Sequence, residues 1–446
     1  MLLGPGGCGP ARETPAPQRA RTGRAASVTS ASGDRRPPLP GIEPTLRIRV
    51  ASFSNTNASK ALVLGAAGSQ LWVSTPELDR PGRIVLGPMK VLAGKGGWTI
   101  EGTGRRRGGR EVIQTATPLA IAAVGRGAIQ WNDAPLEGLL RVVRPSGGKP
   151  GEFDLVTHVA MERYLPGVLE RELFTSWPVA TFEAQAIAAR SFAVCERAFW
   201  LSRRHYDVVA GPSSQAWSGG VASSRARAAV SATIGHVLVW DRRVVPAYYS
   251  ASCGGIPASA TDAIGGNPSN AIPPLTVSNA EQRRDQGCCE ESPYGSWTVS
   301  FNRSEIVKAL NKAGKSKGPK AMTSITHITS IDVLSRNPAG RPVEYRLSVD
   351  AGRTIPIGAE ALRRALNIDR ASNRIRSSYV AYDVTPSEVL ARGHGWGHGV
   401  GLCQYGAKTM GRAGRSANEI LQRYYPSATI AQGWETSRPI GQYVGA

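Results

Sequence analysis

The chain lacks a long apolar run and a recognisable leader. None of its apolar stretches approaches the roughly 18 to 20 residues that a membrane-spanning helix needs, so we predict no transmembrane segment. Met1–Gly7 is too short for the apolar core of a signal peptide, and Pro, Arg and Gly follow it. Two explanations stay open: the start codon is misassigned, or the chain is exported by a route that the sequence does not reveal.

Cysteine is scarce, and its spacing does not indicate a metal site. The six Cys residues among 446 include no C-x-x-C pair, which argues against a zinc ribbon. They are too few for a disulfide framework, although one or two bridges stay open. Cys288 and Cys289 are adjacent, and adjacent cysteines more often bond elsewhere or not at all than to each other.

Acidic residues are outnumbered by basic ones, 33 to 54, which gives a formal charge of +21. This balance favours anionic partners such as nucleic acid, a membrane surface or anionic wall polymers. The densest basic clusters are Arg105–Arg107 and Lys312–Lys320, and neither alternates with aromatic residues or accompanies a nucleic-acid-binding motif. We therefore predict no nucleic-acid partner and interpret the charge as a solvated basic surface.

The 51 Gly and 31 Pro residues predict a loop-rich fold that changes character along the chain. We expect a disordered tail over residues 1–41, a β-rich region over 42–150, a second domain over 151–432 and a tail over 433–446. The linker Pro145–Glu152 marks the boundary between the two middle regions. Alternating segments predict strands in the β-rich region, at 45–50, 61–64, 70–73, 83–86 and 98–101, with a closing hairpin or meander at 127–131 and 138–143.

The second domain mixes helices with strands. Helices are predicted at 165–173, 178–201, 303–313, 358–366 and 417–424. Strands are predicted at 153–159 and 296–301, and hairpins at 237–240 with 244–249 and at 325–335 with 341–349. Glu183–Val194 is rich in Ala, whose small side chain lets other backbones approach closely, so a buried central helix is expected. The fold class is therefore α+β, with mixed, mostly antiparallel sheets and a buried Ala-rich helix, plus the β-rich N-terminal region.

Glu172 stands at the end of an apolar helical stripe. It follows Leu165, Val168 and Leu169 at offsets of 7, 4 and 3, which places all four residues on one face of a helix. Loss of solvent raises the pKa of a carboxyl group, and a carboxyl group protonated near neutral pH suits a general acid for a glycosidic oxygen. The alternative is a Glu paired at a helix end with an arginine such as Arg171 or Arg190, and on pattern alone this alternative is the more frequent one.

The run Gly393–Gly406 alternates Gly with larger residues. In an extended chain, His394, Trp396 and His398 would share one face, and the other face would be bare backbone on which a second segment or a ligand can lie. Two His beside a Trp could bind a sugar or a metal ion. A glycine-rich bend with hydrogen-bonded His is an equally weighted alternative, and no G-x-G-x-x-G motif supports a dinucleotide site.

Two further groups of polar residues are candidates for chemistry. Ser250, Ser252 and Cys253 lie at the end of a strand and are candidate nucleophiles, and Cys253 with His398 would make a cysteine-hydrolase pair. A Cys beside small residues is more often a buried thiol or half-cystine. Gln185 and Arg190 are the long polar residues in the middle of the Ala-rich helix, where core hydrogen bonding and substrate contact are weighed equally.

Taken in order over about residues 150–430, these segments resemble the SpoIID/LytB family. The matching segments are ERYLPGVLERE (Glu162–Glu172), Trp177, EAQAIAARS (Glu183–Ser191), Asp207, SQAWSGG (Ser214–Gly220), YYSASCGG (Tyr248–Gly255), GHGVGLCQYGA (Gly397–Ala407) and YYP (Tyr424–Pro426). Two departures stand out: Arg163 replaces an opening Glu, and Leu173-Phe174 replace a Met-Pro pair.

The resemblance implies a lytic transglycosylase that cleaves the MurNAc–GlcNAc bonds of peptidoglycan, or a non-catalytic enhancer of a cell-wall amidase. In the first case Glu172 protonates the bridging oxygen, and the muramic C6 hydroxyl attacks C1 to give a 1,6-anhydro ring without a second carboxylate. Peptidoglycan strands would be the partners, joined in the enhancer case by a cell-wall amidase. The location would be the cell envelope, outside the cytoplasm. The expected substrate-binding residues are Gln185, Arg190, Gln215, Trp217, Ser252, Gly254, Gly255, His394, Trp396, His398, Gln404 and Tyr405.

Some members of the family bind zinc through a Cys and a His in the turn before the Q-x-Y/W motif. That turn has Val209, Ser213 and Ser214 here. We therefore predict no metal site and no cofactor.

Overall fold

The computed structural model describes residues 34–53, 62–75, 82–94, 97–103, 110–115, 117–125, 128–149, 151–211, 214–278, 291–316, 318–370, 372 and 374–435. The described residues from Arg35 to Glu435 form one compact unit. The described part has helices and mostly antiparallel sheets, so the predicted α+β class is confirmed. No helix in the described ranges is long and apolar enough to cross a membrane.

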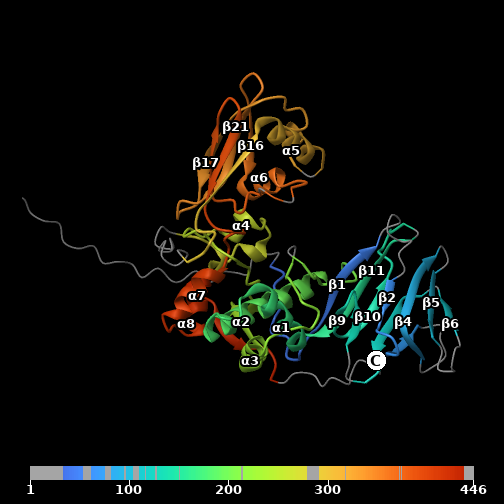
Figure 1. Ribbon diagram of the computed structural model, residues 1–446. Helices are drawn as coiled ribbons and strands as arrows, with labels where there is room; N and C mark the ends of the chain where they lie inside the picture. The colour runs from blue at the N-terminus through green and yellow to red at the C-terminus, as the bar shows by residue number, and fades with distance from the viewer. Residues whose placement is uncertain are drawn as a thin grey trace, which may run out of the picture. The chain divides into compact units, whose positions relative to one another are not determined.

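The largest sheet among the described residues has ten strands and takes in most of the N-terminal region (Figure 1). Its order is β12-β1-β11-β10-β7-β3-β4-β5-β6, and β2 pairs with β4. Alternating side chains build its core, as in β1, where Leu46 and Ile48 are buried. The bounds are Thr45–Phe53 (β1), Leu62–Leu64 (β2), Gln70–Ser74 (β3), Arg83–Gly94 (β4), Gly97–Thr103 (β5), Arg110–Thr115 (β6), Leu119–Ala123 (β7), Leu139–Val143 (β10), Phe153–Ala160 (β11) and Val208–Val209 (β12).

The sheet continues across the predicted domain boundary. Pro145–Glu152 falls between β10 and β11, which pair antiparallel, so this segment connects neighbouring strands of one sheet. A Gly- and Pro-rich turn has the same composition as a linker, and composition alone cannot separate the two. The expected closing hairpin also differs: β8 (Ile129–Trp131) pairs with β9 (Ala134–Leu136), whereas β10 joins the large sheet.

A group of helices contains the predicted buried Ala-rich helix. It is α2 (Val179–Trp200), whose small residues pack against α1, α3, α7 and α8. These neighbours span Met161–Glu172 (α1), Ser224–Ala232 (α3), Gln404–Arg412 (α7) and Ala417–Tyr424 (α8). The last matches its predicted bounds, whereas α1 begins four residues before its predicted start and α7 had not been predicted.

Short sheets bring distant motifs together. In one of them, β15 (Tyr249–Ser250) pairs in parallel with β22 (Leu402–Cys403), which places the YYSASCGG segment beside the glycine-rich run. Another sheet joins β14, β13 and β23. Its strands span Arg243–Val244 (β14), His236–Trp240 (β13) and Thr429–Gln432 (β23).

Residues 297–393 have a hydrophobic core of their own, between β15 and β22 in the chain. Two three-stranded sheets, β16-β21-β20 and β17-β18-β19, contribute to it with helices α5 and α6. The bounds are Trp297–Asn302 (β16), Ile328–Arg336 (β17), Pro342–Val349 (β18), Arg353–Gly358 (β19), Val380–Val384 (β20), Glu388–Gly393 (β21), Arg303–Ser316 (α5) and Ala359–Leu366 (α6). Shorter helical pieces lie at Ala260–Ala263 (α4), Pro268–Asn270, Pro273–Leu275 and Lys320–Met322.

Parts of both predicted tails are packed against the fold. Arg36, 2% exposed, donates from Nη1 to the Trp240 carbonyl at 3.0 Å. At the other end, the Trp434 indole is buried and donates to Glu162 Oε1 at 3.0 Å. The prediction of disordered tails therefore reached too far into the chain, because it could not see these long-range contacts. Residues 1–33 and 436–446 lie outside the described residues.

Candidate functional site

Glu172 is the last residue of α1, and its carboxyl group is partly buried. Its Oε1 accepts a hydrogen bond from the Ala216 backbone N–H at 3.3 Å, and its Oε2 accepts one from Gln404 Nε2 at 3.0 Å. Within the described part of the chain no Lys or Arg forms an ion pair with it. The site therefore joins the first family motif to the end of the glycine-rich run.

Burial raises the pKa of Glu172 above its ordinary value, and the hydrogen bonds from Gln404 and Ala216 lower it by less. Two buried phenols, Tyr164 and Tyr249, have their pKa values raised well above the ordinary value, first by burial and then by the charge of Glu172. They stay neutral and keep the surroundings of the carboxyl group low in charge. A carboxyl group with a raised pKa can hold its proton nearer neutral pH than an exposed one.

Arg190 has a different role from the predicted substrate contact. It is completely buried, and it binds the Glu162 carboxylate with Nε at 3.0 Å and Nη2 at 2.8 Å. The same carboxylate also accepts the Gly235 backbone N–H. Arg190, one of the two arginines considered as a partner for Glu172, is therefore paired with another acid, and this pair joins α1 to α2 inside the core. The other, Arg171, forms no ion pair with Glu172 in the described part of the chain.

Three more predicted contacts lie behind the site. Gln215 is buried, accepts from the Tyr164 hydroxyl at 3.1 Å and donates to the Tyr249 hydroxyl at 3.0 Å. These two hydrogen bonds hold Gln215 in place, and the backbone N–H of the next residue, Ala216, donates to Glu172. Trp217 is buried against Gly167, and Gln185 is fully buried with no hydrogen-bond partner for its amide among the described residues. In place of the predicted substrate contact, Gln215 and Trp217 pack behind the segment that binds Glu172, and Gln185 lies in the core.

The glycine-rich run is bent, so its large side chains do not share one face as predicted. Positive φ angles recur at every second residue, at Gly395 (78°), Gly397 (101°), Gly399 (79°) and Gly401 (65°). Such angles are rarely adopted by residues with a Cβ, which is why glycine recurs there. The alternation of Gly with larger residues in the sequence therefore reflects these repeated bends and not an extended strand.

The two histidines of the run have separate environments. His394 Nδ1 lies 3.2 Å from the Gly295 carbonyl oxygen. His398 Nδ1 accepts from the Val400 backbone N–H at 3.0 Å, and burial lowers the pKa of His398 to about 4. A neutral His398 that already accepts a backbone hydrogen bond fits the alternative of a satisfied histidine in a bend.

The bare backbone of the run contacts another segment of the chain. Ser252 is fully buried and exchanges two backbone hydrogen bonds with Trp396, of 3.1 and 2.8 Å. A Cβ on Gly254 would come within 2.7 Å of the His394 carbonyl carbon, and Gly255, like Gly254, has a positive φ. Ser252 and Gly254, predicted to bind substrate, instead contact the run, and Gly255 turns the chain with its positive φ.

The cysteine-hydrolase alternative finds no support in the geometry. Cys253 is 1% exposed, and its backbone N–H donates to Sγ of Cys403. A thiol buried in this way is out of reach of a polymeric substrate. No group of three His, Cys, Asp or Glu side chains is arranged to hold a metal ion in the described ranges. Ser213, part of the turn where some family members bind zinc, lies outside the described residues.

Five aromatic side chains form a row that passes the site. We call Phe174, Trp177, Tyr405, Tyr294 and Trp396 the aromatic row. Successive ring centroids are 5.6, 5.0, 6.1 and 4.3 Å apart. The two ends are exposed, Phe174 at 62% and Trp396 at 42%, whereas Trp177 and Tyr405 are buried. Exposed aromatic rings on a rigid base suit the apolar face of a sugar ring.

The aromatic row meets Glu172 through α7. Tyr405 follows Gln404, the residue that binds the Glu172 carboxylate. Tyr405 and Trp396 had been predicted to bind substrate, and Phe174 and Tyr294 had not. The three-residue spacing of Phe174 and Trp177 could have indicated a pair of rings, but nothing near Tyr294 in the sequence would have indicated it.

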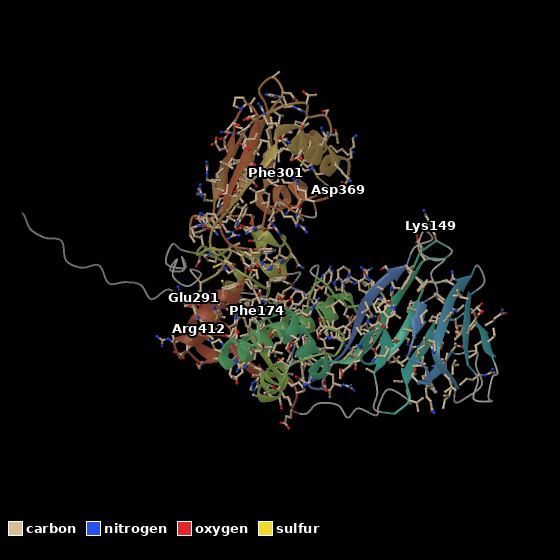
Figure 2. All side chains as sticks on the ribbon, in the orientation of Figure 1. Lys149, Phe174, Glu291, Phe301, Asp369 and Arg412 are labelled. Carbon is tan, nitrogen blue, oxygen red and sulfur yellow. The ribbon has the colours of Figure 1, made fainter. Side chains whose placement is uncertain are left out.

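Charged side chains border the row beside α7. Glu291 accepts from Lys408 Nζ at 2.8 Å and from Arg412 Nη1 at 2.7 Å. Figure 2 labels Glu291 and Arg412, which lie near each other. The Lys408 ammonium group also lies 5.8 Å from the Trp177 ring and 5.6 Å from the Tyr405 ring. These two cations therefore share one carboxylate.

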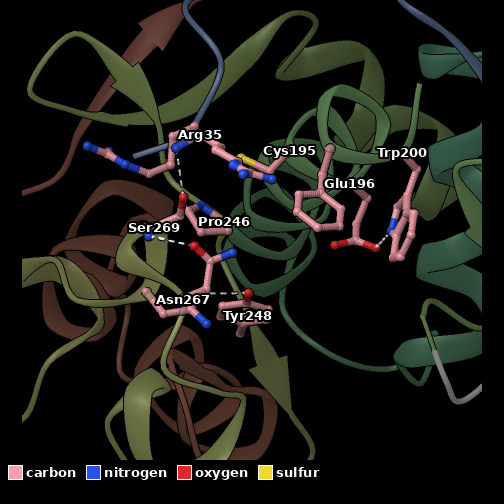
Figure 3. Close-up of a pocket in the computed structure, with 11 residues that line it drawn as sticks. Arg35, Cys195, Glu196, Trp200, Pro246, Tyr248, Asn267 and Ser269 are labelled. Carbon is pink, nitrogen blue, oxygen red and sulfur yellow. Dashed lines mark hydrogen bonds between the residues drawn. The ribbon is translucent and has the colours of Figure 1, made fainter. Parts of the chain in front are cut away.

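A separate pocket of about 140 Å³ lies where the segment at Arg35 meets α2 (Figure 3). It is lined by Glu196, whose pKa is raised by burial, and by Trp200, whose indole donates to that carboxylate at 3.1 Å. None of the predicted site residues lines it. We therefore place the candidate site at Glu172.

Comparison with known proteins agrees with the motifs. Residues 149–240, which include Glu172, match the family model described as SpoIID, stage II sporulation protein. A curated relative, the amidase enhancer of Bacillus subtilis (strain 168), is 26% identical over 296 residues. Over these residues the chain is similar to the SpoIID/LytB family. The matched part covers 60% of this chain and 40% of the amidase enhancer, so the chain spans less than half the length of that relative.

Two more matches extend over the SpoIID/LytB-like region. An uncharacterized protein of Brachyspira hyodysenteriae (strain ATCC 49526 / WA1) is 24% identical over 282 residues, which cover 62% of this chain and 68% of that protein. Residues 280–401 match a domain of unknown function (DUF8618). This second range contains Tyr294 and Trp396, so the aromatic row draws on both matched parts of the chain.

Proposed function

We propose that this chain is a peptidoglycan lytic transglycosylase that cleaves MurNAc–GlcNAc strands, with Glu172 as its single general acid. One observation carries the proposal. The Glu172 carboxyl group is partly buried, has a raised pKa, has no basic partner among the described residues and lies beside the aromatic row. That combination suits proton donation to a glycosidic oxygen.

The reaction needs one carboxyl group in two roles. Glu172 gives its proton to the bridging oxygen while the bond from that oxygen to the muramic C1 breaks. The muramic C6 hydroxyl forms the new bond to C1, and the Glu172 carboxylate takes the hydroxyl proton. The acid is thereby regenerated, and the product ends in a 1,6-anhydro ring.

Neighbouring carboxylates are committed elsewhere, which fits a mechanism with one acid. Glu162 binds Arg190, and Glu170 Oε2 accepts the Ser223 backbone N–H at 2.8 Å. A hydrolytic glycosidase commonly places a second carboxylate about 5 to 9.5 Å from the acid to act on water or on the sugar. An internal nucleophile removes this requirement.

A second candidate function is suggested by the named relative. The chain would then be a non-catalytic module that binds peptidoglycan and stimulates a cell-wall amidase, because a matched relative is called an amidase enhancer. Both candidate functions place the chain at the cell envelope, outside the cytoplasm, with peptidoglycan strands as the partner. They differ in whether the proton of Glu172 is used.

The test compares the wild-type chain with Glu172→Gln on purified peptidoglycan, with Glu183→Gln as a control for the loss of one carboxylate from a neighbouring helix. We expect wild type and Glu183→Gln to release fragments with 1,6-anhydro ends and Glu172→Gln to release none. If all three proteins are inert and all stimulate an amidase equally, the enhancer function replaces the transglycosylase.

A further inference from the structure

A cationic side chain lies over the outer end of the aromatic row. The Arg376 guanidinium carbon lies 5.4 Å from the centroid of the Trp396 ring and 5.8 Å from that of the Tyr294 ring. Arg376 is partly exposed, and no carboxylate in the described ranges forms an ion pair with it. This contrasts with Lys408 and Arg412, which share Glu291.

Backbone hydrogen bonds hold the segments that carry these three side chains next to one another. The Gly397 N–H donates to the Arg376 carbonyl at 2.9 Å, and the Gly395 N–H donates to the Tyr294 carbonyl at 2.8 Å. Tyr294 and Trp396 also pack edge to face, with an angle of 63° between their rings. A site that is already ordered loses little conformational entropy on binding.

The chemistry of the cluster indicates a sugar that carries an acid. The exposed face of Trp396 suits the C–H face of a pyranose, and a guanidinium group can bind a carboxylate through two parallel hydrogen bonds. We propose that Arg376, Trp396 and Tyr294 form a subsite for a carboxylate-bearing pyranose of the glycan strand. The identity of this polymer rests on the proposed function. Tyr294 contacts Tyr405, so the subsite continues the row that reaches Glu172.

Two sources could supply the carboxylate. Muramic acid carries it on the lactyl ether when the strand has no peptide, and the stem peptide carries it otherwise. Both present the same chemistry to Arg376, whereas an oligomer of N-acetylglucosamine presents a neutral pyranose alone. Comparing the three ligands therefore separates recognition of the ring from recognition of the charge.

The experiment measures equilibrium binding to the full chain in the Glu172→Gln background, so that no ligand is cleaved. The ligands are a peptide-free strand, a peptide-bearing strand and a neutral N-acetylglucosamine oligomer. Arg376→Gln should weaken binding of at least one acidic strand by about tenfold, the loss expected for one charge-assisted contact, and leave the neutral oligomer unchanged. The acidic strand affected identifies the carboxylate. Trp396→Ala should weaken all three.

Arg374→Gln is the matched control, because Arg374 is exposed two residues away and loses the same charge. It should bind all three ligands as the parent does. Equal losses for neutral and acidic ligands in Arg376→Gln, or none for either acidic strand, would overturn the subsite. Thermal unfolding of each variant checks that the fold is intact. Because binding is measured without turnover, a failed subsite is distinguishable from a chain that binds normally but lacks transglycosylase activity.

Discussion

The carboxyl group of Glu172 is set between two opposing effects. Burial favours its protonated form, and the hydrogen bond from the Gln404 amide favours its charged form. A general acid needs a balance, because a group that never releases its proton is as ineffective as one that has already lost it. Gln404 is therefore a residue through which the pH range of activity can be tuned.

Replacing Gln404 with Met should move the pH profile of activity. Activity of a general acid falls as pH rises through its pKa, because the proton is lost. Gln404→Met removes a hydrogen bond that lowers the pKa of Glu172, so the alkaline limb should shift to higher pH. Initial rates measured across pH check this, with Gln70→Met on the exposed edge of β3 as the control. An unmoved alkaline limb, or a shift to lower pH, would contradict this role of Gln404.

Glu172 should also make the fold less stable at neutral pH. Its folded pKa is raised, so the folded chain binds its proton more tightly than the unfolded chain does, and stability falls as pH rises through the unfolded and then the folded pKa. Glu172→Gln should therefore raise the free energy of unfolding at pH 7 by up to about 1 kcal/mol. The gain should disappear at pH values below the unfolded pKa. Urea unfolding at several pH values checks both expectations, and a variant less stable than wild type at pH 7 would contradict them.

The sequence predicted the position of Glu172 better than it predicted which other residues are accessible to a substrate. The helical spacing placed Glu172 correctly at the end of an apolar face, and the structure shows its burial. Gln215, Arg190 and Ser252 were expected to contact substrate and are buried instead, because a family motif contains residues that support a site as well as residues that line it. Which of these two roles a residue has depends on its tertiary neighbours.

At the scale of elements, the Glu162–Arg190 pair joins α1 to α2. Glu162→Gln should leave the buried Arg190 charge without its counterion and lower the free energy of unfolding by about 3 to 5 kcal/mol. Urea denaturation of the full chain measures the change. Glu183→Gln on α2, whose carboxylate forms no ion pair with a described residue, should change it by less than about 0.5 kcal/mol. A similar effect of the two substitutions would show that the buried pair is not a principal link between the helices.

A second link joins residues 297–393 to the glycine-rich run. Arg341, buried just before β18, donates to the carbonyls of Cys253 at 2.9 Å and Ile256 at 2.8 Å, and to that of His398 at 3.4 Å. Arg341→Met keeps much of the volume but removes every one of these donors. Backbone carbonyls that lose a buried donor destabilise the local structure.

Arg341→Met should speed hydrogen exchange at residues 253–256 and 395–400, through a loss of about 3 kcal/mol in local stability. Exchange in β17 and β19, which belong to the separate hydrophobic core, should stay as in wild type. Arg346→Met on the exposed side of β18 is the control. Uniform acceleration across the chain, or none in the two loops, would contradict this role.

Elements with a strong repeating pattern were predicted well. The predicted strands at 70–73 and 98–101 and the helix at 417–424 match β3, β5 and α8 closely. In contrast, β20, β21 and α7 were missed. Helix α7 directly follows the glycine-rich run and itself contains two glycines, so its sequence pattern indicates a loop. Its helical conformation depends on packing against α2.

At the scale of the whole chain, composition placed boundaries where the fold has none. The ten-stranded sheet combines residues assigned to both predicted middle regions, and residues 297–393 form a core between β15 and β22 that no change of composition marked. Strand pairing and core membership are long-range properties, whereas Gly and Pro content is local. The separate core explains how one chain can match two family models over different ranges.

The central claim is that the Glu172 proton and an internal sugar hydroxyl together cleave the strand. The most direct measurement is mass spectrometry of the products from defined glycan strands digested in heavy-oxygen water. The account predicts reducing ends that are one water lighter than hydrolysed ends and carry no heavy oxygen, and no products with Glu172→Gln. Products that contain heavy oxygen, or unchanged cleavage by Glu172→Gln, would contradict it.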